Sequence, residues 1–376
     1  MKIAFLSVFY PYRGGIAQFN AAVYRALGKI QNVEIKAFNF SRLYPKLLFP
    51  GKDQYVTAND TAFHMPSERI LDGMNPFNWN SAANKIIDFK PDFLLTDFWL
   101  PFFSPSLGKV AKKLRKNNTP VISILSNVVP HEKRMFDIAL TKYFLKNNDG
   151  FIILTESVKN DLLKLKPDAK YLVHPHPNYE HFGEPLSKEE ARKFLNLPLN
   201  KKVILFFGLI RYYKGLDLLL EAMGKLNNDY YLLIAGEVYG KPDLYDEIIG
   251  KNNLSDKVKF VNKYLSDDEV APYFSAADVC VLPYRSATQS GIIGVSYHFG
   301  LPVISTDVGG LKEVIEPFRT GIVLDKADID LLKVSLENYF VNNLAVDFKR
   351  NIASFSERYN WDTLANCIID LYKQIS

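Results

Sequence analysis

The chain has 376 residues, which suits two domains of ordinary size, and its 48% hydrophobic and 23% charged residues exclude a disordered or fibrous protein. Its longest clear apolar run, VILFFGLI at residues 203–210, is far shorter than the roughly 18 residues that a membrane span needs, which favours a soluble protein. The formal net charge is +5, and no basic groove studded with aromatic residues indicates nucleic-acid binding.

The first half of the chain alternates short apolar strands with amphipathic helices. We expect helices near residues 16–29, 81–88 and 106–116, and strands at residues 2–8, 33–40, 92–98, 121–126 and 151–155. This alternation predicts a parallel sheet with helices on both faces. The opening MKIAFLSVFYPY runs directly into the first strand without the small-residue cleavage site of a signal peptide, so we expect a cytoplasmic protein.

A proline-rich stretch, HPHPNYEHFGEP at residues 174–185, interrupts this pattern. We interpret it as the hinge between an N-terminal domain, residues 1–175, and a C-terminal domain, residues 176–358. His174, His176 and His181 look like a metal cluster at first sight. However, the prolines between them and the lack of a completing carboxylate or cysteine favour a linker, and we predict no metal site.

The alternating pattern then restarts. Helices are expected near residues 215–226, 242–252, 267–276 and 291–299, and strands at residues 203–209, 230–236, 258–262, 279–284 and 302–307. The sequence therefore predicts two Rossmann-like, doubly wound α/β domains that face each other across a cleft, with ligands beyond the carboxyl ends of the strands. Cys280 lies inside the apolar run ADVCVLPY, which favours a buried free thiol over a disulfide.

Two cations follow the first strand of the C-terminal domain, in the loop FFGLIRYYKG at residues 206–215. Arg211 and Lys214 are three residues apart and are flanked by Gly208 and Gly215. Both could point into one cleft and neutralise a diphosphate, Arg211 by its fork and Lys214 as a point charge. The alternative is a pair of solvated loop cations, but their place at a strand end favours the binding role.

A second loop, SATQSG at residues 286–291, leads into a helix. The first turn of that helix offers unpaired backbone N–H groups at Ser290, Gly291 and Ile292, and such a turn can hold a phosphate. The alternative is an ordinary helix cap. A third loop, PYRGGIAQF at residues 11–19, places Gly14 and Gly15 after the first strand but lacks the full GxGxxG spacing, which argues against an ordinary dinucleotide site.

Together these segments resemble the glycosyltransferases of the GT-B fold, and most closely the retaining group called family 4. The likeness rests on the glycine pair at residues 14–15, FGLIRYYKG, LLIAGE, AADVCVLP, GLPVISTDVGGLKE and FSERYNWDTLANCIIDLY. The resemblance implies that residues 359–376 form a helix that crosses back to the N-terminal domain. It also implies a nucleotide sugar, carried by UDP or GDP, whose contacts in this sequence are Gly14, Gly15, Gly208, Arg211, Lys214, Gly236, Glu237, Tyr284, Thr288, Gln289, Ser290, Gly291, Ile292 and Glu313.

The donor loop departs from the family pattern. Aligned without gaps, Ala287 and Val295 stand where the family usually has two glutamates eight residues apart, one at the donor sugar and one at the ribose. Instead, Thr288, Gln289 and Ser290 offer hydroxyl and amide groups. We therefore expect a variant, ATQSG-type donor site.

Three residues of the N-terminal domain are candidates for the acceptor side. His131, in LSNVVPHEKR, falls where the family often has a histidine near the transferred sugar, although a lone histidine is more often structural. Asp97, in LLTDFW, ends a strand and could bind an acceptor hydroxyl, with Trp99 as a stacking platform. A capping aspartate and a packed tryptophan are the alternatives.

The resemblance implies a retaining transfer in which the leaving diphosphate helps to deprotonate the incoming hydroxyl, with His131, Arg211 and Lys214 as the catalytic residues and no metal or other cofactor. The expected acceptor is a glycan or a lipid-linked glycan of surface polysaccharide synthesis. Two alternatives stay open. One is a nucleotide-sugar epimerase of the same fold, and the other is a non-catalytic nucleotide-sugar-binding subunit that has lost both glutamates.

The positive charge of the chain lies in its N-terminal half. Residues 1–175 hold 24 Lys and Arg against 14 Asp and Glu, a net charge of +10, and the rest of the chain carries −5. Much of this charge lies in KVAKKLRKNN at residues 109–118. The stretch favours either a solvated helix face or a peripheral contact with anionic lipid at the inner face of a membrane.

Overall fold

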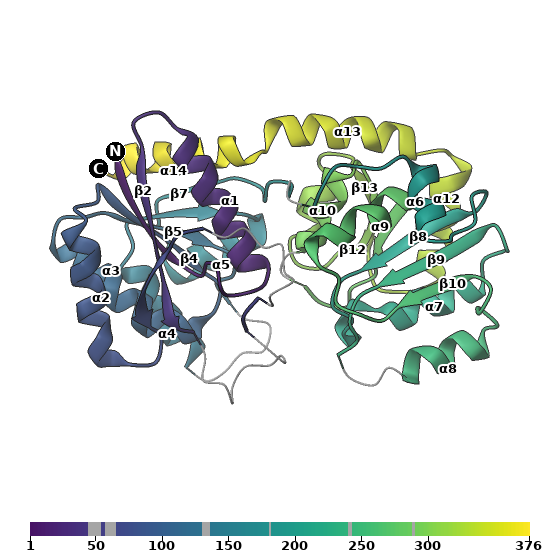
Figure 1. Cartoon of the computed structure of the whole chain (residues 1–376), viewed down its shortest axis with the longest axis horizontal. Coiled ribbons are helices and arrows are strands. Elements are labelled where there is room, and N and C mark those ends of the chain that lie inside the picture. The colour runs from purple at the N-terminus through teal and green to yellow at the C-terminus, as the bar shows by residue number, and fades with distance from the viewer. Residues whose placement is uncertain (44–53, 57–64, 130–135, 180–181, 240–242, 288–289) are drawn as a thin grey trace. The chain divides into compact units, whose positions relative to one another are not determined.

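The computed structural model describes residues 1–43, 54–56, 65–129, 136–179, 182–239, 243–287 and 290–376. It divides the chain into two compact units (Figure 1). The first unit comprises Met1–His176 together with Tyr359–Ser376, and the second comprises Pro177–Arg358. Each unit has one parallel β-sheet, which confirms the predicted α/β class.

The first unit contains a seven-stranded sheet in the order β3-β2-β1-β4-β5-β6-β7. Its strands are β1 Lys2–Ser7, β2 Glu34–Arg42, β3 Glu68–Asp72, β4 Phe93–Phe98, β5 Val121–Leu125, β6 Gly150–Ile153 and β7 Tyr171–Val173. Its helices are α1 Gly15–Lys29, α2 Pro76–Asp88, α3 Ser104–Lys116, α4 Asp137–Lys146, α5 Glu156–Leu165 and α14 Trp361–Ile375. The strand order reverses between β1 and β4, which places a topological switch point there.

Helices cover both faces of this sheet (Figure 1). The connection from β1 to β2 and the connection from β4 to β5 move in opposite directions, so right-handed crossovers place α1 and α3 on opposite faces. Helix α1 packs beside α14, while α2, α3 and α4 pack side by side. All these crossover helices run against the strands, so α2, α3 and α4 begin at the edge where the strands end.

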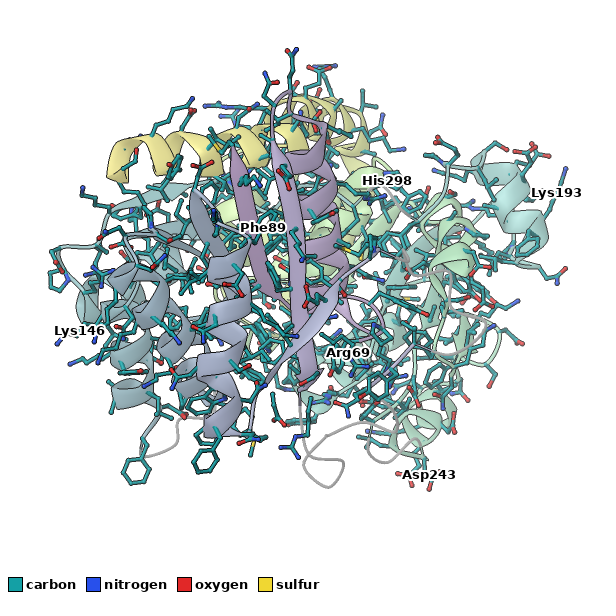
Figure 2. The ribbon with its side chains drawn as sticks, turned by 60° about the vertical axis from the view of Figure 1, so that its left-hand side comes forward. Arg69, Phe89, Lys146, Lys193, Asp243 and His298 are labelled. Carbon is teal, nitrogen blue, oxygen red and sulfur yellow. The ribbon has the colours of Figure 1, made fainter. Side chains whose placement is uncertain are left out.

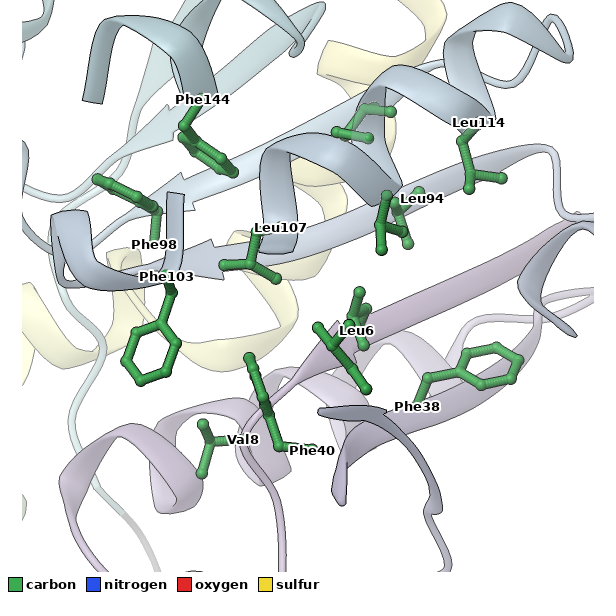
Figure 3. Packing of buried hydrophobic residues seen from close by; sticks show 14 of the residues in the cluster. Leu6, Val8, Phe38, Phe40, Leu94, Phe98, Phe103, Leu107, Leu114 and Phe144 are labelled. Carbon is green, nitrogen blue, oxygen red and sulfur yellow. The ribbon is translucent and has the colours of Figure 1, made fainter. Parts of the chain in front are cut away.

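The hydrophobic core of the first unit lies between β1, β2, β4 and α3 (Figure 3). Leu6 of β1, Leu94 of β4 and Leu107 of α3 are fully buried. The ring of Phe98, at the end of β4, stacks on Phe144 of α4 with 4.2 Å between centroids. This packing fixes the carboxyl end of β4.

The second unit repeats the plan with six strands in the order β10-β9-β8-β11-β12-β13. They are β8 Lys202–Phe207, β9 Tyr230–Ala235, β10 Val258–Val261, β11 Val279–Leu282, β12 Val303–Thr306 and β13 Gly321–Leu324. The helices are α6 Lys188–Phe194, α7 Leu216–Gly224, α8 Asp243–Lys251, α9 Val270–Ala276, α10 Gly291–His298, α11 Leu311–Ile315, α12 Ile329–Val341 and α13 Ala345–Arg358. A single 3₁₀ turn, η3 Tyr212–Lys214, precedes α7. The switch point of this sheet lies between β8 and β11.

The elements expected from the sequence correspond to strands and helices of both units, but several others were not predicted. The missed strands β3, β7 and β13 are all at or near the ends of their sheets. The missed helices are α4, α5, α6, α11, α12 and α13. Cys280 is buried and free, as predicted. In the part of the chain that the structure describes, no helix is both long and apolar enough to cross a membrane.

Candidate functional site

The candidate site lies in the second unit, where β8 and β11 end at the switch point of the sheet. Beyond β8 the chain makes the loop from Gly208 to Gly215, and beyond β11 it runs from Pro283 to the start of α10. Neighbouring strands that leave the sheet in opposite directions open a crevice at their carboxyl ends, which is where ligands of such sheets bind. The predicted phosphate-binding residues all follow these two strands.

The backbone at this edge is closely packed around two glycines. Gly208 has a φ of +97° and Gly236 a φ of +155°, conformations that favour glycine. A Cβ atom on Gly236 would lie 2.0 Å from the carbonyl oxygen of Gly208. A Cβ atom on Gly208 would lie 3.3 Å from Lys214 Nζ and 3.3 Å from Ile292 Cδ1. Gly208 is therefore the point where the Lys214 amine and the first turn of α10 come together.

Lys214 is a buried cation, with a relative exposure of 9%. Its amine makes no hydrogen bond or ion pair with any described residue, and its nearest ring is that of Tyr284, at 5.4 Å from the centroid. Burial and, to a smaller extent, the charge of Arg211 lower the pKa of the Lys214 amine to about 8. A buried amine without an acidic partner is the kind of group that an anionic ligand would stabilise.

Arg211 stands at the N-cap of η3, half-buried. Its guanidinium lies 5.1 Å from the ring centroid of Tyr239, and among the described residues it has no ion pair or side-chain hydrogen bond. The positive charge of Arg211 also contributes to the lowered pKa of the Lys214 amine. Neither charge is offset by a described carboxylate.

Helix α10 presents its N-terminus to the same edge. Its N-cap is Ser290, whose side chain makes no capping hydrogen bond to the helix. Gly291 is exposed, and a Cβ atom there would lie 3.4 Å from the Tyr179 ring. The N–H groups of Gly291 and Ile292 are therefore the free donors that begin a helix. Thr288 and Gln289 lie outside the described residues.

Tyr284 stabilises the segment that follows β11. The Tyr284 carbonyl accepts a 2.6 Å hydrogen bond from Thr306 Oγ1, which ties the segment after β11 to the end of β12. Tyr284 Oη is buried near the Ser290 side chain but makes no hydrogen bond of normal geometry with a described residue. Burial raises the pKa of this phenol above its usual range, so it stays a neutral hydrogen-bond donor.

Comparison with known proteins finds a family match for part of the chain. Residues 187–355, all within the second unit, match the family model described as glycosyl transferases group 1. The D-inositol 3-phosphate glycosyltransferase of Corynebacterium urealyticum is 29% identical over 223 residues, which are 54% of this chain and 51% of that protein. The chain spans about half the length of the relatives named D-inositol 3-phosphate glycosyltransferase. An uncharacterized glycosyltransferase of Methanocaldococcus jannaschii is 23% identical over 100% of this chain and 99% of its own.

Solved structures resemble the chain over its whole length. Sucrose-phosphate synthase from Thermosynechococcus elongatus has a TM-score of 0.75 at 21% identity and covers 99% of this chain and 98% of its own. The Anabaena protein HepE in complex with UDP has a TM-score of 0.76 at 15% identity, with 100% of both chains covered. The chain has the GT-B fold.

The remaining donor-site candidates take varied places in this GT-B fold. Glu237 follows β9, and its backbone oxygen accepts a 2.8 Å hydrogen bond from the N–H of Ile210. Glu313 lies in the first turn of α11. Gly14 and Gly15 belong to the first unit, where Gly14 is the N-cap of α1 with a φ of +112°. No atom of a described residue lies within 4 Å of a Cβ built on either glycine.

Two of the acceptor candidates pack within the first unit, Asp97 fully buried and Trp99 partly buried. Asp97 has no exposed surface; its Oδ1 accepts a 2.9 Å hydrogen bond from Ser126 Oγ, and its Oδ2 is buried without a bond to a described residue. Burial raises the pKa of this carboxyl to about 7. The Trp99 ring packs 4.8 Å from Phe103. This packing favours structural roles for both residues. His131 lies outside the described residues.

The hinge histidines have structural contacts within the first unit. His174 Nε2 lies 2.9 Å from Thr363 Oγ1 of α14, and His174 Nδ1 lies 2.7 Å from the carbonyl oxygen of Pro175. The His176 ring lies 5.8 Å from that of Trp361, also in α14. His181 is outside the described residues. Among the residues that are described, no three His, Cys, Asp or Glu side chains are arranged to hold a metal.

Sequence reasoning missed an ion pair at the site. Arg285 Nη1 and Nη2 donate to Asp217 Oδ1 and Oδ2 at 2.8 and 2.6 Å. Asp217 lies in the first turn of α7, three residues after Lys214. The position of Arg285 just beyond β11 could have indicated a residue of the site. No local sequence pattern indicates its partner, which is 68 residues away.

Proposed function

We propose that the chain is a retaining, family 4 type glycosyltransferase that moves a sugar from a UDP- or GDP-sugar to a glycan or lipid-linked acceptor. One observation carries the proposal. The buried Lys214 amine has no acidic partner in the described chain and lies beside Arg211 and the open N-terminus of α10. The family match over the second unit and the likeness to a UDP-bound GT-B protein support it.

The donor diphosphate would bind at the edge centred on Gly208. The Lys214 amine and the Arg211 guanidinium supply positive charge, and the N–H groups of Gly291 and Ile292 supply hydrogen bonds. The glycine backbone at Gly208 allows close approach because no side chain intervenes. Tyr284 Oη, a buried hydroxyl without a hydrogen bond of normal geometry to a described residue, adds a neutral contact.

These groups act on charge that develops as the bond between sugar and phosphate breaks. In a front-face reaction the sugar leaves the diphosphate as the acceptor hydroxyl enters from the same side, and a diphosphate oxygen receives the hydroxyl proton. Each preorganised donor to the leaving group is typically worth about 3 kcal/mol. Lys214 and Arg211 supply the charge stabilisation that a divalent ion provides in other transferases, so we propose transfer without a metal or other cofactor.

One observation favours a second candidate, a binding subunit without catalytic activity. Val295, which stands at a family glutamate position, is only 3% exposed and packs inside the unit from α10. It offers the donor no polar contact, and neither does Ala287. Donor binding without transfer or hydrolysis across a broad acceptor panel would identify this second function. Consumption of the nucleotide sugar without any acceptor would instead indicate an epimerase.

A ligand screen tests the proposal. The melting temperature of the protein is measured with UDP, GDP, their sugars, and uridine and guanosine as controls. A ligand at 100 times its dissociation constant stabilises the protein by about 2.7 kcal/mol. We expect one nucleoside diphosphate and its sugar to stabilise the protein and the nucleosides to have little effect. Equal, weak effects of all these compounds would contradict a diphosphate site.

The binding of the diphosphate should weaken with rising pH. The pKa of the Lys214 amine is lowered to about 8 in the free protein, so the amine is charged below this pH and neutral above it. We expect the affinity for the diphosphate found in the screen to be constant from pH 6.5 to 7.5 and to fall from pH 8 upward, approaching tenfold per pH unit. Calorimetric titration at four pH values measures this. The change should be absent in Lys214→Arg, whose charge persists throughout.

We also propose that the protein works in the cytoplasm at the inner face of a membrane, with the α2–α4 face of the first unit against anionic lipid. Lys109, Lys112 and Lys116 of α3 are exposed and have no ion pair in the described chain. Lys146 of α4 also lies at the outer edge of this unit (Figure 2). Phe77, in the first turn of α2, is 92% exposed. The combination of cations and exposed aromatic rings suits a headgroup surface.

Sedimentation with lipid vesicles tests this contact. We expect binding to vesicles with 30% phosphatidylserine, weak binding to phosphatidylcholine alone, and loss of binding at high salt. Lys109→Glu with Lys112→Glu should weaken binding at least tenfold, because each lysine near the surface contributes about 1 kcal/mol. Phe77→Ser should weaken it as well. Val341→Ser is the matched control, since Val341 is 77% exposed but lies in the second unit.

A further inference from the structure

The loop that carries Lys214 has little structure of its own. Its only regular element is η3, a single turn of three residues. Gly215, which follows, has a φ of +69° and ends the turn. Burial disfavours the charged form of the Lys214 amine, and the nearby charge of Arg211 repels it. A single short turn therefore needs contacts from other segments to keep this amine buried.

Arg285, in the segment after β11, makes several contacts to this turn. Its backbone N–H donates to the carbonyl oxygen of Tyr213 at 2.7 Å, and its Nη1 donates to the carbonyl oxygen of Tyr212 at 2.8 Å. Its guanidinium also lies 4.2 Å from the ring centroid of Tyr212. Arg285 therefore binds two of the three residues of η3, leaving only Lys214 to extend inward.

Asp217, in the first turn of α7, binds the Arg285 guanidinium. The two-pronged pair with Arg285 is largely shielded, with side-chain exposures of 25% for Arg285 and 19% for Asp217. Such planar, doubly bonded pairs are stronger and more directional than ordinary surface pairs. Hydrogen bonding to Asp217 raises the pKa of Arg285, so the charge is present at every working pH.

The segment that carries Arg285 is itself fixed. Thr306 Oγ1 donates to the carbonyl oxygen of Tyr284, the residue before Arg285. On the other side, the carbonyl oxygen of Pro283 lies so close to Gly215 that a Cβ atom there would be 2.0 Å away. Residues 283–285 thus connect the end of β12 to η3, and Tyr284 presents its ring to the Lys214 amine.

We propose that the Arg285–Asp217 pair is the positioning device of the donor site: it clamps η3 against the segment after β11 and thereby holds the Lys214 amine in its buried place beside Gly208. Arg285 acts through Lys214 and does not itself contact the ligand. The functional part of this inference rests on the proposed nucleotide-sugar site, whereas the placement of Lys214 by Arg285 does not.

The first test measures Lys214 itself, without a ligand. Lysines are labelled by reductive ¹³C-methylation, and the pKa of the Lys214 amine is read from its NMR titration. In the wild type we expect a value of about 8. In Arg285→Ala the turn should open and the pKa should move toward the ordinary 10.5. A pKa in Arg285→Ala equal to that of the wild type would overturn the proposal.

The second test measures how well the protein distinguishes UDP from uridine. Arg285→Ala should weaken UDP binding by about tenfold or more, which corresponds to about 1.4 kcal/mol, and should change uridine binding less than about twofold. A uniform loss for both compounds, or none, would overturn the proposal. If the wild type binds UDP no better than uridine, the proposed function fails for this nucleotide, and the Lys214 titration still decides the clamp.

Matched variants separate positioning from simple damage. Asp217→Asn removes the charge but keeps the side-chain volume, and should reproduce both effects; it also replaces Arg285→Ala if that variant does not fold. Lys225→Ala breaks a 2.6 Å ion pair with Asp330 elsewhere in the same unit and should leave both readouts unchanged. Arg285→Lys keeps a charge without the fork and should fall between wild type and Arg285→Ala. An Asp217→Asn variant with the wild-type Lys214 pKa would contradict the clamp.

Discussion

Lys214→Met is expected to lower glycosyl transfer about a hundredfold or more while making the protein more stable. The substitution keeps the aliphatic volume of the side chain and removes the charge that we assign to the diphosphate, an interaction typically worth about 3 kcal/mol. The gain in stability has a separate cause. Burial lowers the pKa of this amine from 10.5 in the unfolded chain to about 8 in the fold, so the fold disfavours its charge.

The pH range of that gain follows from the same shift. Below pH 8 the amine is charged in both states, and the folded protein bears the full cost of burying it, up to about 3 kcal/mol. Between pH 8 and 10.5 the folded protein loses its proton and the cost disappears. Chemical unfolding at pH 7 and 10 should show a stability advantage of Lys214→Met at pH 7 that shrinks at pH 10. Unchanged transfer at saturating donor would contradict the role of Lys214.

Gly215→Ala is expected to destabilise the second unit by more than 2 kcal/mol and to disturb the donor site with it. At a φ of +69° an alanine costs about 1 kcal/mol on backbone grounds alone. Its Cβ atom would also lie 2.0 Å from the carbonyl oxygen of Pro283, so η3 or the segment after β11 must move. Both segments position Lys214, and we expect loss of diphosphate binding together with a lower melting temperature.

Gly250→Ala serves as the control for this substitution. Gly250 lies inside α8, and no atom of the described residues is within 4 Å of a Cβ built on it. Alanine is the better helix former by about 1 kcal/mol, so this variant should be slightly more stable than the wild type and bind the diphosphate normally. If Gly215→Ala were as stable as Gly250→Ala, the close contact between η3 and Pro283 would be wrong.

The alternation of strands and helices was readable because the central strands are buried on both faces. All of β4, from Phe93 to Phe98, is buried, and such a run stands out in any sequence. Strand β13, Gly321–Leu324, is short and only partly buried, which leaves a weak signal. Helix α4 was missed for another reason. Its first turn exposes Ile138 at 46%, so apolar residues lie on more than one face and blur the helical period.

Part of the site could be predicted from the sequence, because residues that directly follow a strand of a parallel sheet lie at the edge where ligands bind. Arg211 and Lys214 were found from their place after a strand, and the structure brings Lys214 to Gly208. Burial was harder to predict. Asp97 follows the same strand-end rule but extends into the interior beneath Ser126, and the sequence does not distinguish the two outcomes. The pairing of Arg285 with Asp217 depends on the order of β8 and β11 in the sheet, which no local pattern encodes.

The most direct measurement of the central claim is the labelling of Lys214 by acetic anhydride, followed by mass spectrometry, with and without nucleotide. With a pKa of about 8, Lys214 carries a reactive neutral fraction near pH 7.5, so it should be labelled in the free protein. We predict that UDP or GDP, at saturation, protects Lys214 from labelling, that the matching nucleoside does not, and that Lys225 is labelled equally in all samples. Labelling of Lys214 that no nucleoside diphosphate changes would contradict the diphosphate site.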